Sequence, residues 1–180
     1  MQLVRLRWSF GRPNRARLIG LPCRRKSRLI RYVRVLLVDD FFPFRDFLRT
    51  SIERIPECAV VGEASDGIEA VEKTLELAPD LILLDIGLPK MSGIEVARQI
   101  QQSSPQTKIL IVSGMCDWDL IEQSFLCGAG GYLVKADAAS ELSPGVELVL
   151  MGAQFLSTTA IRHVLEECKH SGSAPFLHRI

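Results

Sequence analysis

The chain has 180 residues, of which 47% are hydrophobic and 24% are charged, and this composition excludes a wholly disordered chain. No apolar run reaches the ~18–20 residues that a membrane span needs. The five cysteines lack the paired spacing of a zinc site or a disulfide framework. We therefore expect a cytoplasmic protein with reduced thiols.

The net charge of +1 is unevenly distributed along the chain. Residues 1–34 carry eleven Lys or Arg and no acid. Residues 35–180 therefore contain the other 11 basic residues and all 21 acidic ones, which gives this part a net charge of −10. We expect residues 1–32 to be a basic, disordered extension, because Gly and Pro interrupt any helix there. The composition is also typical of an organelle transit peptide or of an arm that neutralises nucleic-acid phosphates. These alternatives remain open.

From residue 33 onward, short apolar segments alternate with amphipathic ones. The apolar segments predict strands at 33–40, 58–64, 80–85, 108–114 and 131–135. Apolar residues at helical spacing predict helices at 44–55, 66–77, 92–102 and 117–128. A last helix is expected at 143–152, beginning at Pro144, because proline suits the first helical position and costs about 3 kcal/mol inside a helix.

The predicted strands are almost entirely apolar, so helices should cover both of their faces. Five such strands alternating with helices indicate an α/β fold with a doubly wound parallel sheet and right-handed crossovers. The carboxyl ends of parallel strands meet at one edge of the sheet, where ligands bind. The sequence places five polar side chains at these strand ends, and we expect them to converge: Asp39, Asp40, Asp85, Ser113 and Lys135.

Three neighbouring carboxylates repel one another unless a cation neutralises them, and carboxylate oxygens are typical ligands of Mg²⁺. Lys135 and the Ser113 hydroxyl would add donors for phosphate oxygens. This set of groups suits phosphoryl transfer, with Asp85 as the nucleophile because it ends the strand expected at the centre. A simpler interpretation remains open, in which Asp39 and Asp40 only cap the first helix.

Four motifs in the expected order resemble response-regulator receiver domains of two-component systems. They are "VDD" (38–40), "LLDIGLPKMSG" (83–93), "IVSG" (111–114) and "GAGGYLVK" (128–135). The resemblance covers residues 33–152 and implies a flavodoxin-like fold with five strands in the order 2-1-3-4-5. It also implies a phosphorelay function.

The resemblance assigns the acidic residues to one site. Asp85 would accept a phosphoryl group from a sensor histidine kinase. Asp39, Asp40 and Asp85 would bind Mg²⁺ together with the backbone carbonyl of Gly87, with Asp39 acting partly through water. No acid stands at Gly87 to act as a general acid, which makes a phosphatase a weaker interpretation.

The resemblance also implies a conformational switch. Lys135 and Ser113 would bind the phosphoryl oxygens, and Ser113 and Tyr132 would be the switch pair that controls partner binding. The chain would be a signalling protein rather than an enzyme. We expect self-dephosphorylation to be slow, because Gly87 and Met115 offer no carboxamide or acid to orient an attacking water.

Residues 153–180 resemble the start of the linker in regulators with a LuxR-type helix-turn-helix output. We expect a linker-like helix and a tail there, without the output domain, so that the chain is a stand-alone receiver or a truncated regulator. The expected partners are a histidine kinase and an unknown downstream protein, and a homodimer is left open. Membrane binding is not expected, and DNA would be bound only through the basic extension. The alternatives are a non-phosphorylated receiver-like adaptor and a truncated DNA-binding transcriptional regulator.

Overall fold

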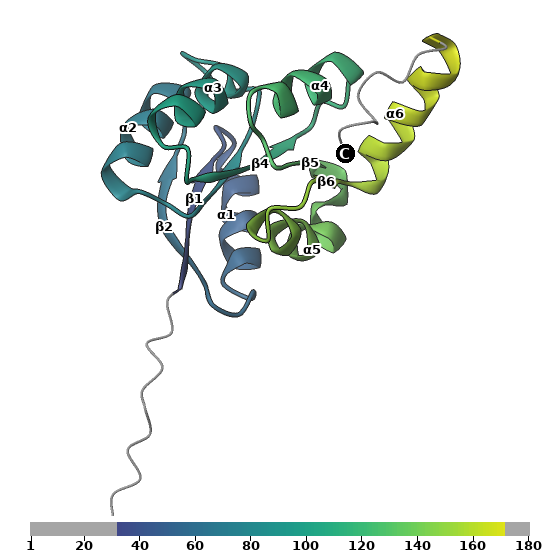
Figure 1. Ribbon diagram of the computed structural model, residues 1–180. Helices are drawn as coiled ribbons and strands as arrows, with labels where there is room; N and C mark the ends of the chain where they lie inside the picture. The colour runs from purple at the N-terminus through teal and green to yellow at the C-terminus, as the bar shows by residue number, and fades with distance from the viewer. Residues whose placement is uncertain (1–31, 172–180) are drawn as a thin grey trace, which may run out of the picture.

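A computed structural model describes residues 32–171, so the predicted basic extension lies outside the described residues apart from Tyr32. Six parallel strands form one sheet in the order β2-β1-β3-β4-β5-β6 (Figure 1). The strands are β1 (Val33–Val38), β2 (Cys58–Ala64), β3 (Leu81–Leu84), β4 (Lys108–Ser113), β5 (Gly131–Val134) and β6 (Phe155–Leu156).

Helices connect the strands and follow the last one. They are α1 (Phe42–Ile52), α2 (Gly67–Leu77), α3 (Gly93–Ser103), α4 (Trp118–Leu126), the 3-10 turn η1 (Lys135–Asp137), α5 (Ala138–Leu150) and α6 (Thr158–Ser171). None of the helices within residues 32–171 is long and apolar enough to cross a membrane.

The predicted order of the first five strands is confirmed, and the sheet has a sixth strand that the sequence did not indicate. β6 pairs in parallel with β5 through Gly131 opposite Phe155 and Tyr132 opposite Leu156. Two residues carry too little periodicity to be recognised as a strand. As a result, β5 is an interior strand, and α6 follows directly from the sheet (Figure 1).

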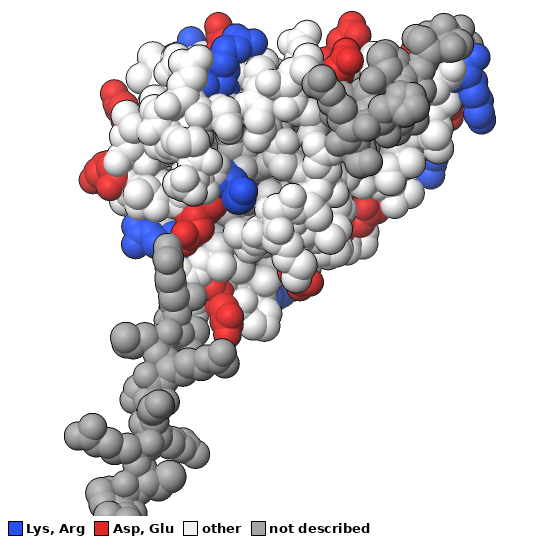
Figure 2. All heavy atoms as spheres, viewed as in Figure 1, with Lys and Arg blue, Asp and Glu red and all other residues white. Residues whose placement is uncertain are grey.

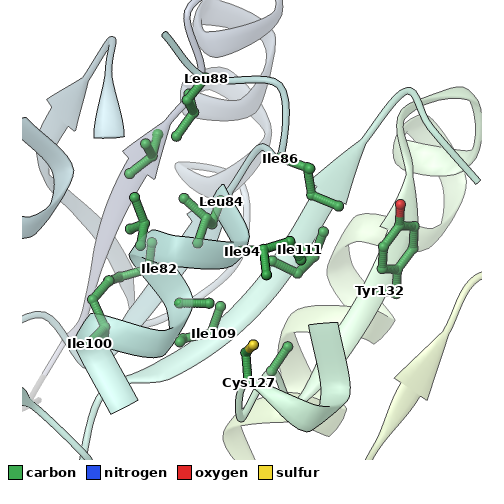
Figure 3. Close-up of a cluster of buried hydrophobic side chains, with 14 of the residues drawn as sticks. Ile82, Leu84, Ile86, Leu88, Ile94, Ile100, Ile109, Ile111, Cys127 and Tyr132 are labelled. Atoms are coloured by element: carbon green, nitrogen blue, oxygen red, sulfur yellow. The ribbon is translucent and has the colours of Figure 1, made fainter. Parts of the chain in front are cut away.

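Two apolar layers enclose the sheet, which explains why its strands are almost wholly apolar. One layer lies between the sheet and the helices α2, α3, α4 and α6, and Ile82, Ile109 and Tyr132 belong to it (Figure 3). The other layer lies between the sheet and the helices α1 and α5. The helix α6 therefore covers the same face as α4 and contacts both α4 and β5.

The predicted start of the last helix at Pro144 is wrong, because α5 begins at Ala138 and contains Pro144. Ala138, Leu142 and Val146 lie on one face of this helix and are buried. Burial of this continuous face outweighs the cost of an internal proline. Pro144 itself is exposed, so water can reach the carbonyl of Ser140 that it leaves without a helical partner.

Replacing Pro144 by Ala is therefore expected to raise the free energy of unfolding by about 1–3 kcal/mol, because a helical hydrogen bond is restored. Urea denaturation followed by circular dichroism measures this difference. Pro43, in the first turn of α1, is the matched control, because its missing N–H has no partner in the helix. An equal gain for Pro43→Ala, or no gain for Pro144→Ala, would contradict this explanation.

Candidate functional site

The structure brings Asp39, Asp85 and Lys135 together at the carboxyl ends of the strands. Asp39 follows β1, Asp85 follows β3 and Lys135 follows β5. The Lys135 ammonium lies 2.7 Å from Oδ2 of Asp39 and 2.8 Å from Oδ2 of Asp85. It also lies 4.8 Å from the centre of the Phe44 ring, which covers it from α1. The cation is thus held between two buried carboxylates and an aromatic ring.

Carboxylate oxygens of Asp39, Asp40 and Asp85 all lie within 4.8 Å of one another. Asp39 and Asp85 are buried, whereas Asp40 is exposed. Oδ2 of Asp39 is buried and makes no hydrogen bond of acceptable geometry, although Lys135 is close to it. An oxygen with a free lone pair beside two other carboxylates fits a hard divalent cation, and Mg²⁺ is the first candidate.

The burial and the charges of this cluster shift its proton affinities. Burial raises the pKa of Asp39, and the neighbouring Lys135 ammonium offsets only part of this effect. Burial alone would lower the pKa of Lys135, but its contacts with Asp39 and Asp85 outweigh burial and raise that pKa. Lys135 is therefore a firmly protonated cation that compensates the two acids.

The interpretation of Asp39 and Asp40 as simple helix caps does not fit the geometry. The first turn of α1 has no side-chain cap. Oδ1 of Asp39 accepts a hydrogen bond of 2.9 Å from the N–H of Phe41, which precedes the helix. This bond fixes the Asp39 carboxylate and leaves its second oxygen facing the cluster.

Arg45 supports the acidic loop, a role that the sequence did not indicate. Its guanidinium donates to the backbone carbonyl of Asp39 at 2.5 Å and to the Glu63 carboxylate at 2.8 Å. Burial alone would raise the pKa of Glu63, but the hydrogen bonds from Arg45 and Arg49 lower it. The only signal in the sequence was a basic residue on a helix beside a strand-end acid, which is too common to be informative.

The loop after Asp85 is tightly fixed. Oδ1 of Asp85 accepts the N–H of Ile86 at 2.7 Å, and the N–H of Gly93 donates to the carbonyl of Ile86 at 3.0 Å. Lys90 in this loop forms an ion pair with Asp66, the N-cap of α2. The bond from Ile86 orients the Asp85 carboxylate, and the bond from Gly93 ties this loop to the start of α3.

Ser113 and Tyr132 lie on neighbouring strands and contact the same backbone residue. Ser113 Oγ accepts a hydrogen bond of 3.3 Å from the N–H of Met115, and the Tyr132 hydroxyl donates to the carbonyl of Met115 at 2.8 Å. Both side chains are buried, and the ring of Tyr132 points into the apolar layer shown in Figure 3. Burial raises the pKa of the Tyr132 phenol, which therefore stays a neutral donor.

A family model described as the response regulator receiver domain matches residues 35–147. The chain belongs to the response regulator receiver family. The resemblance seen in the four sequence motifs is thus confirmed, and the protein contains a receiver domain of two-component signalling.

Curated relatives of this receiver are named as transcriptional regulatory proteins or as response regulators. The chain is 35% identical to the transcriptional regulatory protein LiaR of Bacillus subtilis, over 81% of this chain and 69% of LiaR. It is 31% identical to DegU of Brevibacillus brevis, over 75% of this chain and 57% of DegU. For the response regulator GacA of Pseudomonas viridiflava the identity is 35%, over 69% of this chain and 58% of GacA. The chain thus matches between 57% and 69% of the length of these proteins.

Solved receivers have the same fold. A LuxR-family response regulator from Aurantimonas sp. SI85-9A1 superposes with a TM-score of 0.72 at 35% identity, over 76% of this chain and 97% of that one. The receiver domain of the NarL regulator from Mycobacterium tuberculosis superposes with a TM-score of 0.64 at 31% identity, over 67% of this chain and 98% of that one. The flavodoxin-like receiver fold predicted from the sequence is therefore confirmed.

Proposed function

We propose that this receiver accepts a phosphoryl group on Asp85 from a sensor histidine kinase in the cytoplasm. The observation that carries the proposal is the position of Asp85, which is buried at the end of β3 with Lys135 Nζ 2.8 Å from its Oδ2. A buried carboxylate beside a fixed cation and two further acids suits nucleophilic attack on a phosphorylated donor.

In this reaction a carboxylate oxygen of Asp85 attacks the phosphorus of the donor, and the bond from phosphorus to the donor's leaving atom breaks. The electron pair of that bond stays on the leaving group, and the product is an aspartyl phosphate. Lys135 neutralises charge on the phosphoryl oxygens, and the Ser113 hydroxyl offers them a hydrogen bond. Positioning and charge neutralisation account for most of the catalysis in such a step.

Asp39, Asp40 and Asp85, together with the backbone carbonyl of Gly87, would hold Mg²⁺. The bound cation supplies neutralisation of charge on the phosphoryl oxygens and on the acids around them. The support for this site is the cluster of carboxylate oxygens within 4.8 Å, together with the buried Oδ2 of Asp39, whose neighbour is the Lys135 ammonium and which makes no hydrogen bond.

The aspartyl phosphate would control the binding of a downstream partner through Ser113 and Tyr132. Both contact Met115, so a Ser113 hydroxyl drawn to the phosphoryl group would release the Met115 N–H and change the loop before α4. That change biases the surface around α4, β5 and α5 toward one conformation. The downstream partner would bind this surface. On the face seen in Figure 2, basic and acidic side chains are interspersed, which favours a protein partner over DNA for that face.

Incubation with acetyl phosphate and Mg²⁺, followed by intact-mass measurement, tests the proposal. The wild-type chain is expected to gain ~80 Da, the mass of one phosphoryl group, and Asp85→Asn should gain nothing because an amide is not a nucleophile at neutral pH. Asp46→Asn is the matched control and should gain the same mass as wild type, because Asp46 pairs with Arg49 on α1, outside the acidic cluster. A chain that gains no mass would instead support the alternative of a non-phosphorylated adaptor.

The aspartyl phosphate is expected to be long-lived, with a decay over minutes rather than seconds. Gly87 and Met115 flank Asp85, and a Cβ on Gly87 would lie 3.8 Å from Oδ2 of Asp85 and 4.0 Å from Cε of Met115. Neither residue carries a group that orients water. Loss of the added mass after removal of the donor measures the decay, and Met115→Gln should accelerate it. Decay of the wild type within seconds would contradict this expectation.

A further inference from the structure

The start of α6 is hydrogen-bonded to the strand that leads into Lys135. Ser157 lies between β6 and α6 and is completely buried. Its backbone N–H donates to the carbonyl of Tyr132 at 3.0 Å, and its Oγ accepts a hydrogen bond of 3.1 Å from the N–H of Val134. Val134 immediately precedes Lys135, so one serine fixes the backbone from the proposed switch residue to the phosphate-binding lysine.

The same segment also holds the backbone that follows Lys135. Asp137 in η1 accepts hydrogen bonds from the Thr159 N–H at 2.9 Å and from the Thr159 hydroxyl at 2.8 Å. Burial alone would raise the pKa of Asp137, but the hydrogen bonds from the Ser157 hydroxyl and from Thr159 lower it. Lys135 is therefore flanked on both sides by residues that are bonded to the start of α6.

The Ser157 side chain supplies a hydrogen-bond acceptor that the sheet itself does not provide. β6 ends at Leu156, so no backbone carbonyl of that strand is paired with the N–H of Val134. The Ser157 hydroxyl oxygen accepts this hydrogen bond instead. Without it the buried N–H of Val134 would have no acceptor, and the end of β5 would have to move to reach water. Such a shift would carry the Lys135 backbone with it.

We propose that Ser157 is a positioning residue for phosphoryl transfer, because it sets the position of Lys135 through Val134 and Asp137. This inference rests on the proposed function of Asp85 and adds to it a requirement for the segment from β6 to α6. The ammonium must stay within hydrogen-bond distance of the acceptor, and a displacement of about 1 Å can cost up to ~100-fold in rate.

The test compares Ser157→Ala with wild type in two assays. The rate of phosphorylation by acetyl phosphate is expected to fall about tenfold. The affinity for Mn²⁺, a probe of the acidic cluster measured from the paramagnetic resonance signal of the free ion, should not weaken. In a Lys135→Ala background, Ser157→Ala should cause no further loss of rate, because its effect acts through that lysine.

Ser124→Ala is the matched control, since Ser124 is equally buried but its hydroxyl bonds to the Leu120 carbonyl within α4. The inference is overturned if Ser157→Ala is phosphorylated as fast as wild type. It is also overturned if Ser157→Ala lowers the rate by the same factor in the Lys135→Ala background as in wild type. Weaker Mn²⁺ binding in parallel with the lower rate would overturn it as well. If Ser157→Ala does not fold, Thr159→Val takes its place under the same criteria. A wild-type chain that accepts no phosphoryl group would contradict the proposed function itself, and the inference with it.

Discussion

Replacing Lys135 by Ala is expected to lower the free energy of unfolding by about 3 kcal/mol in the absence of divalent cations, because it leaves two buried carboxylates without their cation. Its ammonium lies 2.7 Å from Asp39 and 2.8 Å from Asp85, and those two acids are nearly inaccessible to water. Addition of Mg²⁺ should restore part of the lost stability, since the metal then provides the compensating charge. Thermal unfolding with and without Mg²⁺ measures both effects.

The same variant is expected to be phosphorylated about 100-fold more slowly, because no cation remains to neutralise the phosphoryl oxygens. Its affinity for Mg²⁺ should increase, since the lysine no longer competes for the same oxygens. Lys73→Ala is a matched control, because Lys73 pairs with Glu69 along α2, outside the acidic cluster and the acceptor loop. A Lys135→Ala chain with wild-type stability and rate would show that this lysine neither compensates the acids nor assists transfer.

Replacing Gly93 by Ala is expected to destabilise the fold by about 3 kcal/mol and to displace the acceptor. A Cβ at this position would lie 2.0 Å from the backbone carbonyl oxygen of Asp85 and 2.8 Å from the Ile86 Cα. Backbone atoms cannot rotate away as a side chain can, so the loop or the start of α3 must shift. The shift moves Asp85 relative to Lys135, and the phosphorylation rate should fall together with stability.

Gly87→Ala is the control for this prediction, because Gly87 lies in the same loop and a Cβ there meets no atom closer than 3.8 Å. Its stability should stay within about 1 kcal/mol of wild type. Urea denaturation of both variants gives the comparison. Equal losses for the two glycine variants would contradict the close contact between α3 and the acceptor backbone.

The sequence was sufficient to predict the first five strands and the clustering of Asp39, Asp85 and Lys135. Runs of four to seven mostly apolar residues have a clear pattern, and the carboxyl ends of parallel strands necessarily meet at one edge. The start of α5 was predicted wrongly because the proline penalty is local, whereas the burial of Leu142 and Val146 depends on the whole sheet. At this position, the tertiary packing of α5 outweighs the low helix propensity of proline.

β6 and the supporting side chains could not be predicted. Two residues of strand have no periodicity, and the partner of β6 is more than 20 positions away along the chain. Arg45 and Ser157 belong to types that are common in helices and loops, so their roles depend on contacts with Asp39 and Val134 that only the folded chain reveals. Such contacts between distant segments leave no local pattern in the sequence.

Locating the added phosphoryl group tests most directly whether Asp85 is the acceptor. The chain would be incubated with acetyl phosphate and Mg²⁺, treated with borohydride to reduce the acyl phosphate to a homoserine side chain, and analysed by peptide mass spectrometry. We predict homoserine at position 85 and at no other acid. An unmodified Asp85, or modification at Asp39 or Asp40 instead, would contradict the proposed function.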